Sequence, residues 1–269
     1  MSRALGTPDC RGGTGATMAH MVMGLGGAEL AVLAVAAVLV GVAKTAIGGV
    51  ASITVALFAM VLPAKESSGA LLPLLIVGDL LAVAAYRRHA DWSALVRLFP
   101  SVAAGILVGT WFMSRVDDTV MRRTIGGVLL LVVAAHLWQR RRKGERNGKG
   151  AASALFYGLL AGFTTMVANA GGAVMAVYLL AMGFPMLTFL GTAAWFFLIV
   201  NVFKVPFSAG LGLIGTESLT LNAILLPGVF LGAFLGRRLI KVLQRGDRQQ
   251  LFQRLILGFT AVSALNLLR

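Results

Sequence analysis

Two stretches of the chain, VGVAKTAIGG (residues 40–49) and GFTTMVANAGG (residues 162–172), each end in a pair of glycines inside a long apolar region. Gly48-Gly49 precedes Gly171-Gly172 by 123 positions. Glycine adopts backbone conformations that strain other residues, so each pair can interrupt a membrane helix. A short apolar run follows each pair. The two stretches therefore predict a duplicated unit whose first helix is broken or re-entrant.

Landmark residues outside these stretches recur in the same order in the two halves, as an internal duplication requires. The matched pairs are Pro63 and Pro185, Asp79 and Asn201, Pro100 and Pro227, Gly105 and Gly232, Gly109 and Gly236, Asp117 and Asp247, and Gly127 and Gly258. Between the halves, QRRRKGERNGKG is basic and has the glycine content of a flexible linker. We expect an N-terminal tail at 1–26 that is disordered or precedes the true start, a first membrane repeat at 27–138, the basic linker at 139–150 and a second membrane repeat at 151–269.

The composition excludes a water-soluble protein. Of the 269 residues, 58% are hydrophobic and 13% are charged, and the mean hydropathy is +0.86. Soluble proteins are roughly 45–50% apolar and about 25% charged. The apolar segments lie at about 28–47, 49–62, 67–86, 93–113, 120–138, 151–169, 171–183, 186–207, 219–236 and 251–268. At about 20 residues per span they allow roughly eight crossings, so we predict an all-α polytopic integral membrane protein.

The distribution of Lys and Arg favours inverted over parallel repeats. If each half crossed the membrane four times, the connections would place 12 positive residues on one face and 10 on the other. If the broken helix gives each half an odd number of net crossings, the numbers become 15 and 7, with the linker on the richer face. Positive residues concentrate on the cytoplasmic side of membrane proteins. We therefore predict two inverted repeats and a cytoplasmic linker, in a bacterial-type inner (plasma) membrane. The net charge of +14 then reflects topology, and no nucleic acid is expected as a partner.

Only three formally charged residues lie within the apolar segments, away from their ends: Lys44, Asp79 and Lys204. An ion near the middle of a bilayer costs about 2.5–3.5 kcal/mol, so such residues usually pair or line a polar pathway. Asp79 can instead form a salt bridge to a lysine or cap a helix break, and either lysine can extend to a membrane face. If all three are interior, the surplus positive charge suits a small anionic substrate.

The two diglycines add backbone donors to these charges. The short run after each pair begins with unpaired N–H groups, and such a helix N-terminus binds anions. Tight helix packing is the alternative role for the glycines. Thr45, Asn169 and Asn201 supply neutral donors nearby.

Motifs of enzymes and metal sites are absent from the sequence. It contains no HExxH, GxSxG or GxxxxGK[ST] motif, and the three histidines (His20, His89 and His136) lie far apart. Cys10 is the only cysteine. We therefore expect no enzyme activity, no cofactor and no metal, with a small anion and membrane lipid as partners and a homodimer as an open option. The rival hypotheses are a permease for a cation or another metabolite, with Asp79 and Asn201 as ligands, and a membrane protein that transports nothing.

Residues 40–49 resemble the opening motif of the TauE/SafE family of membrane anion transporters, often called sulfite exporters. Residues 162–172, with Phe184-Pro185 following, resemble the repeated glycine motif of that family. NVFKVP (residues 201–206) is similar to its N-x-x-K-x-P stretch, and Asp91-Trp92 at the start of a helix also fits.

The resemblance spans about residues 28–268. It implies transport of sulfite, sulfonates, related sulfur oxyanions or small organic anions without ATP hydrolysis by the chain. The chain departs from the usual family pattern in both repeats. In the first, Lys44-Thr45 precedes a run of two glycines where the family usually has three, and in the second, Asn169-Ala170 precedes the glycine pair. The resemblance therefore does not select one anion.

The predicted site joins these residues. We expect Lys44 and Lys204 to attract the anion, and the backbone at the diglycines and the Asn201 side chain to orient it. Asp79 is the predicted proton-coupling group, because a partly buried carboxylate can exchange protons in a useful pH range. The predicted substrate-binding residues are Lys44, Thr45, Gly48, Gly49, Asn169, Gly171, Gly172, Asn201 and Lys204.

Overall fold

The structure is a computed structural model that describes residues 25–46, 51–117 and 150–245, with isolated positions between 119 and 127 and at 251. Gly48 and Gly49 lie outside the described residues. The predicted tail, the linker and the apolar segments at 120–138 and 251–268 lie wholly or largely outside them as well.

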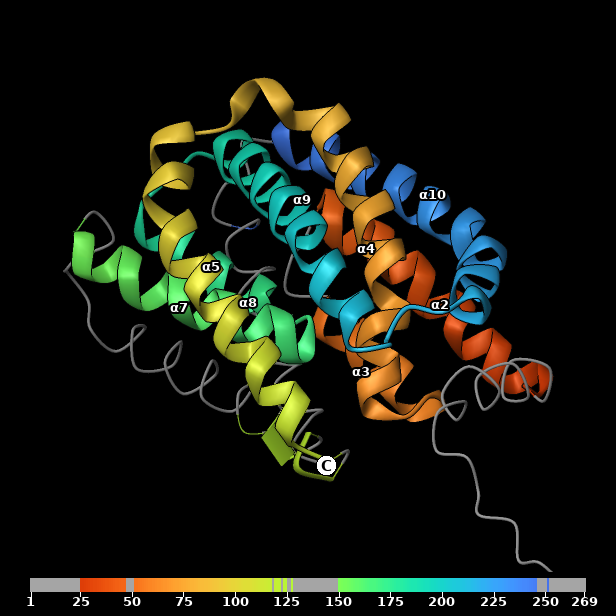
Figure 1. Cartoon of the computed structure of the whole chain (residues 1–269). Coiled ribbons are helices and arrows are strands. Elements are labelled where there is room, and N and C mark those ends of the chain that lie inside the picture. Colours follow the sequence, from red (N-terminus) through yellow and green to blue (C-terminus); the bar gives the residue numbers. More distant parts are fainter. Residues whose placement is uncertain are drawn as a thin grey trace, which may run out of the picture.

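Every regular element of the described part is a helix (Figure 1). The elements are α2 (Gly27–Thr45), α3 (Ala51–Val61), α4 (Ala64–Tyr86), η2 (Arg87–His89), α5 (Trp92–Arg115), α7 (Ala151–Ala168), α8 (Gly171–Ala181), α9 (Met186–Gly210) and α10 (Thr216–Arg245). Six of them, α2, α4, α5, α7, α9 and α10, contain windows long and apolar enough to cross a membrane. The all-helical membrane class is therefore confirmed, while the expected total of about eight crossings stays a prediction.

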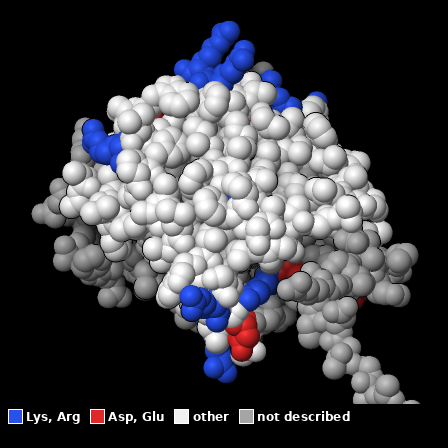
Figure 2. Space-filling view, viewed as in Figure 1, with Lys and Arg blue, Asp and Glu red and all other residues white. Residues whose placement is uncertain are grey.

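Charged side chains lie mainly at two opposite edges of the view in Figure 2. A broad band with almost no charged atoms separates these edges. Exposed large apolar residues such as Val96, Leu107 and Trp111 of α5 contribute to the uncharged surface. This distribution is that of a protein whose middle faces hydrocarbon and whose two ends face water.

The second predicted helix break has an unexpected structure. Asn169, not a glycine, adopts the left-handed conformation with φ of 48°, and its N–H donates to the Thr165 carbonyl at 3.1 Å. Asparagine tolerates this region better than most residues, and the arrangement caps the end of α7. Gly171 then opens α8, where a Cβ atom would lie 2.7 Å from Thr165 Cβ. The glycine is therefore needed for the close approach of α7 and α8.

The short helices after the two breaks do not span a membrane by themselves. α3 and α8 each contain 11 residues. At 1.5 Å per residue each is about 16 Å long, roughly half the thickness of the hydrocarbon core. A charged or polar group at either break can therefore lie well inside the membrane.

Helices α4 and α9 lie antiparallel in the centre of the molecule (Figure 1). Near the start of α9, Gly191 contacts the Tyr86 carbonyl at the end of α4. Near the start of α4, Gly69 contacts Leu213, just after α9. This arrangement brings the middle of α4, with Asp79, beside the middle of α9, with Asn201.

Two further helix pairs join the halves of the chain crosswise. α2 packs along α10 with Gly41 against Gly232, and α5 packs along α7 with Gly105 against Gly162. In both pairs the helices run parallel, and a Cβ atom on any of these glycines would collide with the facing backbone. Small residues let membrane helices approach this closely. The matched glycines Gly105 and Gly232 thus have the same role in the two halves.

Candidate functional site

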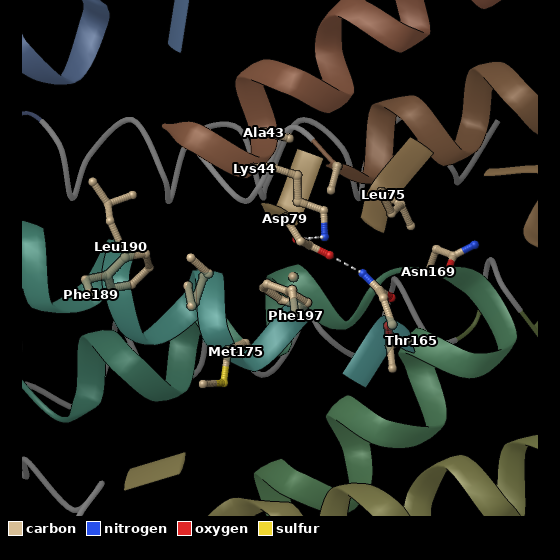
Figure 3. A pocket seen from close by; sticks show the side chains of 16 residues that line it. Ala43, Lys44, Leu75, Asp79, Thr165, Asn169, Met175, Phe189, Leu190 and Phe197 are labelled. Carbon is tan, nitrogen blue, oxygen red and sulfur yellow. Dashed lines mark hydrogen bonds and ion pairs between the residues drawn. The ribbon is translucent and has the colours of Figure 1, made fainter. Parts of the chain in front are cut away.

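A buried ion pair lies between the central helices. Lys44, in the last turn of α2, places its Nζ 2.8 Å from Oδ1 of Asp79 on α4. The second carboxylate oxygen of Asp79 accepts a hydrogen bond of 2.6 Å from Nδ2 of Asn201 on α9. Figure 3 shows Lys44 and Asp79 pointing toward each other beside Phe197. Asp79 therefore joins three helices, and the salt bridge considered from the sequence is present.

The Lys44 side chain is enclosed on its other sides. Its Nζ lies 4.4 Å from the centre of the Phe197 ring, and only 8% of the side chain is exposed. Its Cγ packs against Gly78, where a Cβ atom would lie 2.9 Å away. Aromatic faces attract cations. Lys44 therefore points into the protein and does not extend to a membrane face.

Lys204 lies behind this pair and holds two asparagines. Its Nζ donates to the Thr165 carbonyl at 2.7 Å, to Asn169 Oδ1 at 2.6 Å and to Asn201 Oδ1 at 3.4 Å. The side chain is 1% exposed. Because both amide oxygens face the ammonium, both amide NH₂ groups must point away from it. That of Asn201 reaches Asp79, and that of Asn169 reaches the carbonyl of Ser68 at 2.9 Å.

The Lys204 ammonium also faces the C-terminal end of α7. The Thr165 carbonyl belongs to the last turn of α7, where the helix dipole places partial negative charge. Lys44 and Asp79 neutralise each other formally. The three buried ionisable side chains thus comprise two basic groups and one acidic group, and the negative end of α7 faces the second basic group, Lys204.

A cavity of about 40 Å³ adjoins the ion pair. It is lined by Ala43, Lys44, Ala51, Leu75, Asp79, Thr165, Asn169, Gly172, Met175, Ala176, Phe189, Leu190, Ala193, Ala194, Phe197 and Asn201. By this measure a water needs roughly 10–15 Å³, so the cavity has room for about three waters. Sulfite consists of one sulfur and three oxygen atoms, so this space is on the scale of a small oxyanion.

The structure brings together most of the predicted site residues. Lys44, Asp79, Asn169, Gly172 and Asn201 line the cavity, and Lys204 contacts two of them.

Thr45 and Gly171 have packing roles in this conformation. Thr45 turns away from the cavity, because its hydroxyl donates to the Gly41 carbonyl at 2.8 Å and to the Ala233 carbonyl at 3.3 Å. Gly171 packs against Thr165. Gly48 and Gly49 lie outside the described residues, so their predicted role stays a prediction.

Sequence reasoning missed several residues that shape the site. Thr165 and Ser68 contribute carbonyl oxygens to the network, and backbone acceptors have no signature in a sequence. Phe197 and Phe189 line the cavity but lie among many apolar residues of α9. Tyr86 donates from its hydroxyl to the Thr45 carbonyl at 2.9 Å. A lone tyrosine near the end of an apolar segment was the one available signal for it.

The described residues contain no group of three or more His, Cys, Asp or Glu that could hold a metal ion. The donors present are ammonium and amide groups around a carboxylate, and this chemistry suits an anion or a proton.

Comparison with known proteins gives a match to a protein family. No curated protein and no solved structure matches the chain. The family model of the sulfite exporter TauE/SafE matches residues 33–267, which is nearly the whole chain and includes all the residues of the cavity. Together with the six apolar helices among the described residues that are long enough to cross a membrane, this match identifies a multi-pass membrane transporter. The chain belongs to the TauE/SafE sulfite exporter family.

Proposed function

We propose that this protein is a secondary transporter that moves sulfite, organosulfonates or related small anions across a bacterial-type inner membrane, and that Asp79 couples this movement to protons. The observation that supports the proposal is the position of the Asp79 carboxylate. It lies between the Lys44 ammonium and the Asn201 amide, in the wall of a cavity among the membrane helices. These two donors are the ones that a substrate oxyanion would need.

Asp79 acts in this proposal as a tethered anion that occupies the donors when no substrate is bound. A proton on Asp79 removes its charge and releases Lys44 and the Asn201 amide to the substrate. Loss of the proton returns the carboxylate to the donors and displaces the substrate. The charged groups that face Asp79 are Lys44 on α2 and Lys204 on α9, and the neighbouring helix α3 has no titratable residue. Each transport cycle then moves one proton with one anion.

Alternating access follows from two inverted repeats, which remain part of the proposal. The antiparallel arrangement of α4 and α9 supports this topology, because these helices occupy matching places in the two halves. The two glycine-lined pairs, α2 with α10 and α5 with α7, support it as well. A tilt of one pair against the other would open the cavity first to one face and then to the other.

The experiment is uptake of radiolabelled sulfite and of a sulfonate into proteoliposomes, with and without an imposed pH gradient. The proposal expects wild-type uptake that the gradient stimulates. Asp79→Asn resembles the protonated carboxyl, so this variant should still exchange labelled for unlabelled anion but should lose the stimulation. Arg88→Gln, on the exposed η2 turn, is the control that should behave as wild type.

Three results would contradict the proposal. A wild-type protein that moves none of these anions would exclude anion transport. Counterflow of a metal cation in place of an anion would support the rival cation permease, with Asp79 and Asn201 as its ligands. If Asp79→Asn retains full stimulation by the pH gradient, Asp79 is not the coupling group.

A further inference from the structure

A second, larger cavity lies at the end of the central helix pair. Its volume is about 630 Å³, and it is lined by Ala85, Tyr86, His89, Leu187, Phe234, Arg237, Arg238, Ile240, Lys241 and Gln244. These residues come from the end of α4, from η2, from the start of α9 and from the last turns of α10. This cavity is called the basic vestibule below. Among the lining residues three are cations, Arg237, Arg238 and Lys241, and none is acidic.

The basic vestibule opens to the outside of the protein. Arg238, Lys241 and His89 are exposed, whereas Tyr86 and Ile240 are buried at its inner end. The Arg238 guanidinium stacks on the Phe234 ring, with its carbon 4.5 Å from the ring centre. This contact holds the cation at the wall while its N–H groups stay accessible. In Figure 2, blue Lys and Arg side chains gather at the edge of the molecule where Figure 1 places η2 and the end of α10.

Tyr86 separates the basic vestibule from the buried site. Its ring lines the vestibule, and its hydroxyl donates to the Thr45 carbonyl at 2.9 Å. Thr45 is the neighbour of Lys44, whose ammonium lines the small cavity. An anion that leaves the vestibule inward therefore meets Tyr86 and the end of α2 before it reaches Lys44.

The cavity at the opposite end of the α4–α9 pair is lined by fewer cations. A cavity of about 310 Å³ lies there, lined by Lys65, Met113, Ser114, Gly210, Leu211 and Leu213. Its lining comes from the start of α4, the end of α5 and the end of α9. In the duplicated halves these match the start of α9, the end of α10 and the end of α4, which line the basic vestibule. Its lining contains one cation, Lys65, and that ammonium donates to the Val116 carbonyl. The two ends therefore match in architecture and differ in charge.

From this difference we infer that the basic vestibule is an anion-loading site, which binds the transported oxyanion weakly before it passes Tyr86 to Lys44. The inference rests on the proposed function and names the face from which the protein is loaded most readily. Cations around a cavity with low-dielectric walls raise the local concentration of an oppositely charged solute. Arginine also presents paired N–H donors that match a sulfonate or sulfite group. The volume is large enough for such an ion with part of its hydration shell.

The phosphate of an anionic lipid headgroup has the same oxyanion chemistry. The inference commits to the free solute, because the vestibule leads to the end of α2, beside Lys44. The experiment must separate the two sources.

The test measures the initial rate of radiolabelled sulfite transport in proteoliposomes of neutral phosphatidylcholine, at low and high KCl. The variant Arg237→Gln/Arg238→Gln removes two vestibule charges. Its KM should rise about three- to tenfold at low salt with Vmax within about twofold, because only the loading step weakens. High salt should raise the wild-type KM and reduce the difference, since the Debye length falls as ionic strength increases.

Two matched variants complete the design. Arg87→Gln/Arg88→Gln removes two exposed charges from the same face without touching the vestibule lining, and its KM should stay within about twofold of wild type. Arg237→Lys/Arg238→Lys keeps the charge and should restore most of the affinity. Equal rises in KM for both glutamine variants would assign the effect to general surface charge and overturn the inference, as would an unchanged KM in the vestibule variant.

The lipid arm repeats the measurement with anionic phosphatidylglycerol added to the neutral vesicles. If a headgroup occupies the vestibule, the added lipid will raise the wild-type KM sharply and leave the Arg237→Gln/Arg238→Gln variant unaffected, and the loading site for solute is then excluded. If the wild type transports no sulfite or sulfonate at all, the proposed function fails. If the wild type transports and the vestibule variant matches it, only the loading site fails.

Discussion

The Lys44–Asp79 pair places two opposite charges almost fully out of contact with solvent. Desolvation of such a pair is expensive, and the mutual attraction only offsets it when the remaining donors and acceptors are satisfied. Asn201 satisfies the second carboxylate oxygen, and Phe197 covers the ammonium. Such a pair adds little net stability, and we propose that it serves substrate binding.

Replacement of Lys44 by Gln should abolish anion transport and also destabilise the protein. The Asp79 charge then stays buried without its counterion, which costs about 3–5 kcal/mol. The double variant Lys44→Gln/Asp79→Asn should recover much of the thermal stability in detergent but none of the transport. If the single variant is as stable as wild type, the carboxylate is not buried as described. If the double variant transports normally, neither charge belongs to the site.

Lys204 has a distinct role, because it does not line the cavity but orients two amides that do. We expect Lys204→Gln to abolish flux per folded molecule while the protein still reaches the membrane. A glutamine cannot supply three donors to the Thr165 carbonyl, Asn169 and Asn201, so the amides lose their fixed orientation. Flux is measured against the amount of monodisperse protein, with Arg88→Gln as the control. Normal flux would remove Lys204 from the functional machinery.

The helices could be predicted from sequence because their signals are local. Runs of apolar residues mark the spans, and the interruption after Ala168 lies next to the diglycine, as expected. The detail of the break could not be foreseen. Asparagine and glycine both tolerate the left-handed conformation, and the choice of Asn169 depends on its side-chain bonds to Lys204 and Ser68.

The matched glycines of α5 and α10 give a test of the crosswise pairing of helices. Gly105→Ala and Gly232→Ala should each destabilise the protein by about 1–3 kcal/mol or more, because the added Cβ meets the backbone of α7 or of α2. Thermal melting in detergent provides the measurement. Gly27→Ala is the matched control, since a Cβ there has nothing within 4 Å. If both alanine variants melt at the same temperature as the Gly27→Ala control, these helices do not pack as described.

The arrangement of the whole molecule explains how cavities can exist at both ends of one buried site. α4 and α9 form the central pair, and the crosswise pairs of α2 with α10 and of α5 with α7 pack around it. The two halves therefore interlock, although the chain is divided by the predicted linker at 139–150. Along α4, the small cavity at Leu75 and Asp79 lies between the basic vestibule at Tyr86 and the cavity at Lys65.

Inverted topology predicts which parts of the chain share a side of the membrane. Reporters fused at positions 143 and 245 should report the cytoplasm, together with a cysteine placed at Arg88. A cysteine placed at Ser114, near the end of α5, should react with an impermeant reagent from the opposite side. Positions 143 and 245 on opposite sides would contradict inverted repeats and, with them, the proposed alternating access.

The membrane class, the long helices, the break and the short list of interior charges are properties of the sequence itself. Hydropathy and backbone preference act over a few residues, so they can be read from a linear chain. The partners of those charges depend on packing. Asp79 meets Asn201 at a separation of 122 positions, and Asn169 meets Ser68 at 101. Only the folded chain pairs Lys44 with Asp79, places Lys204 behind the asparagines and gathers three cations around one vestibule, because these contacts require helices from both halves to lie side by side.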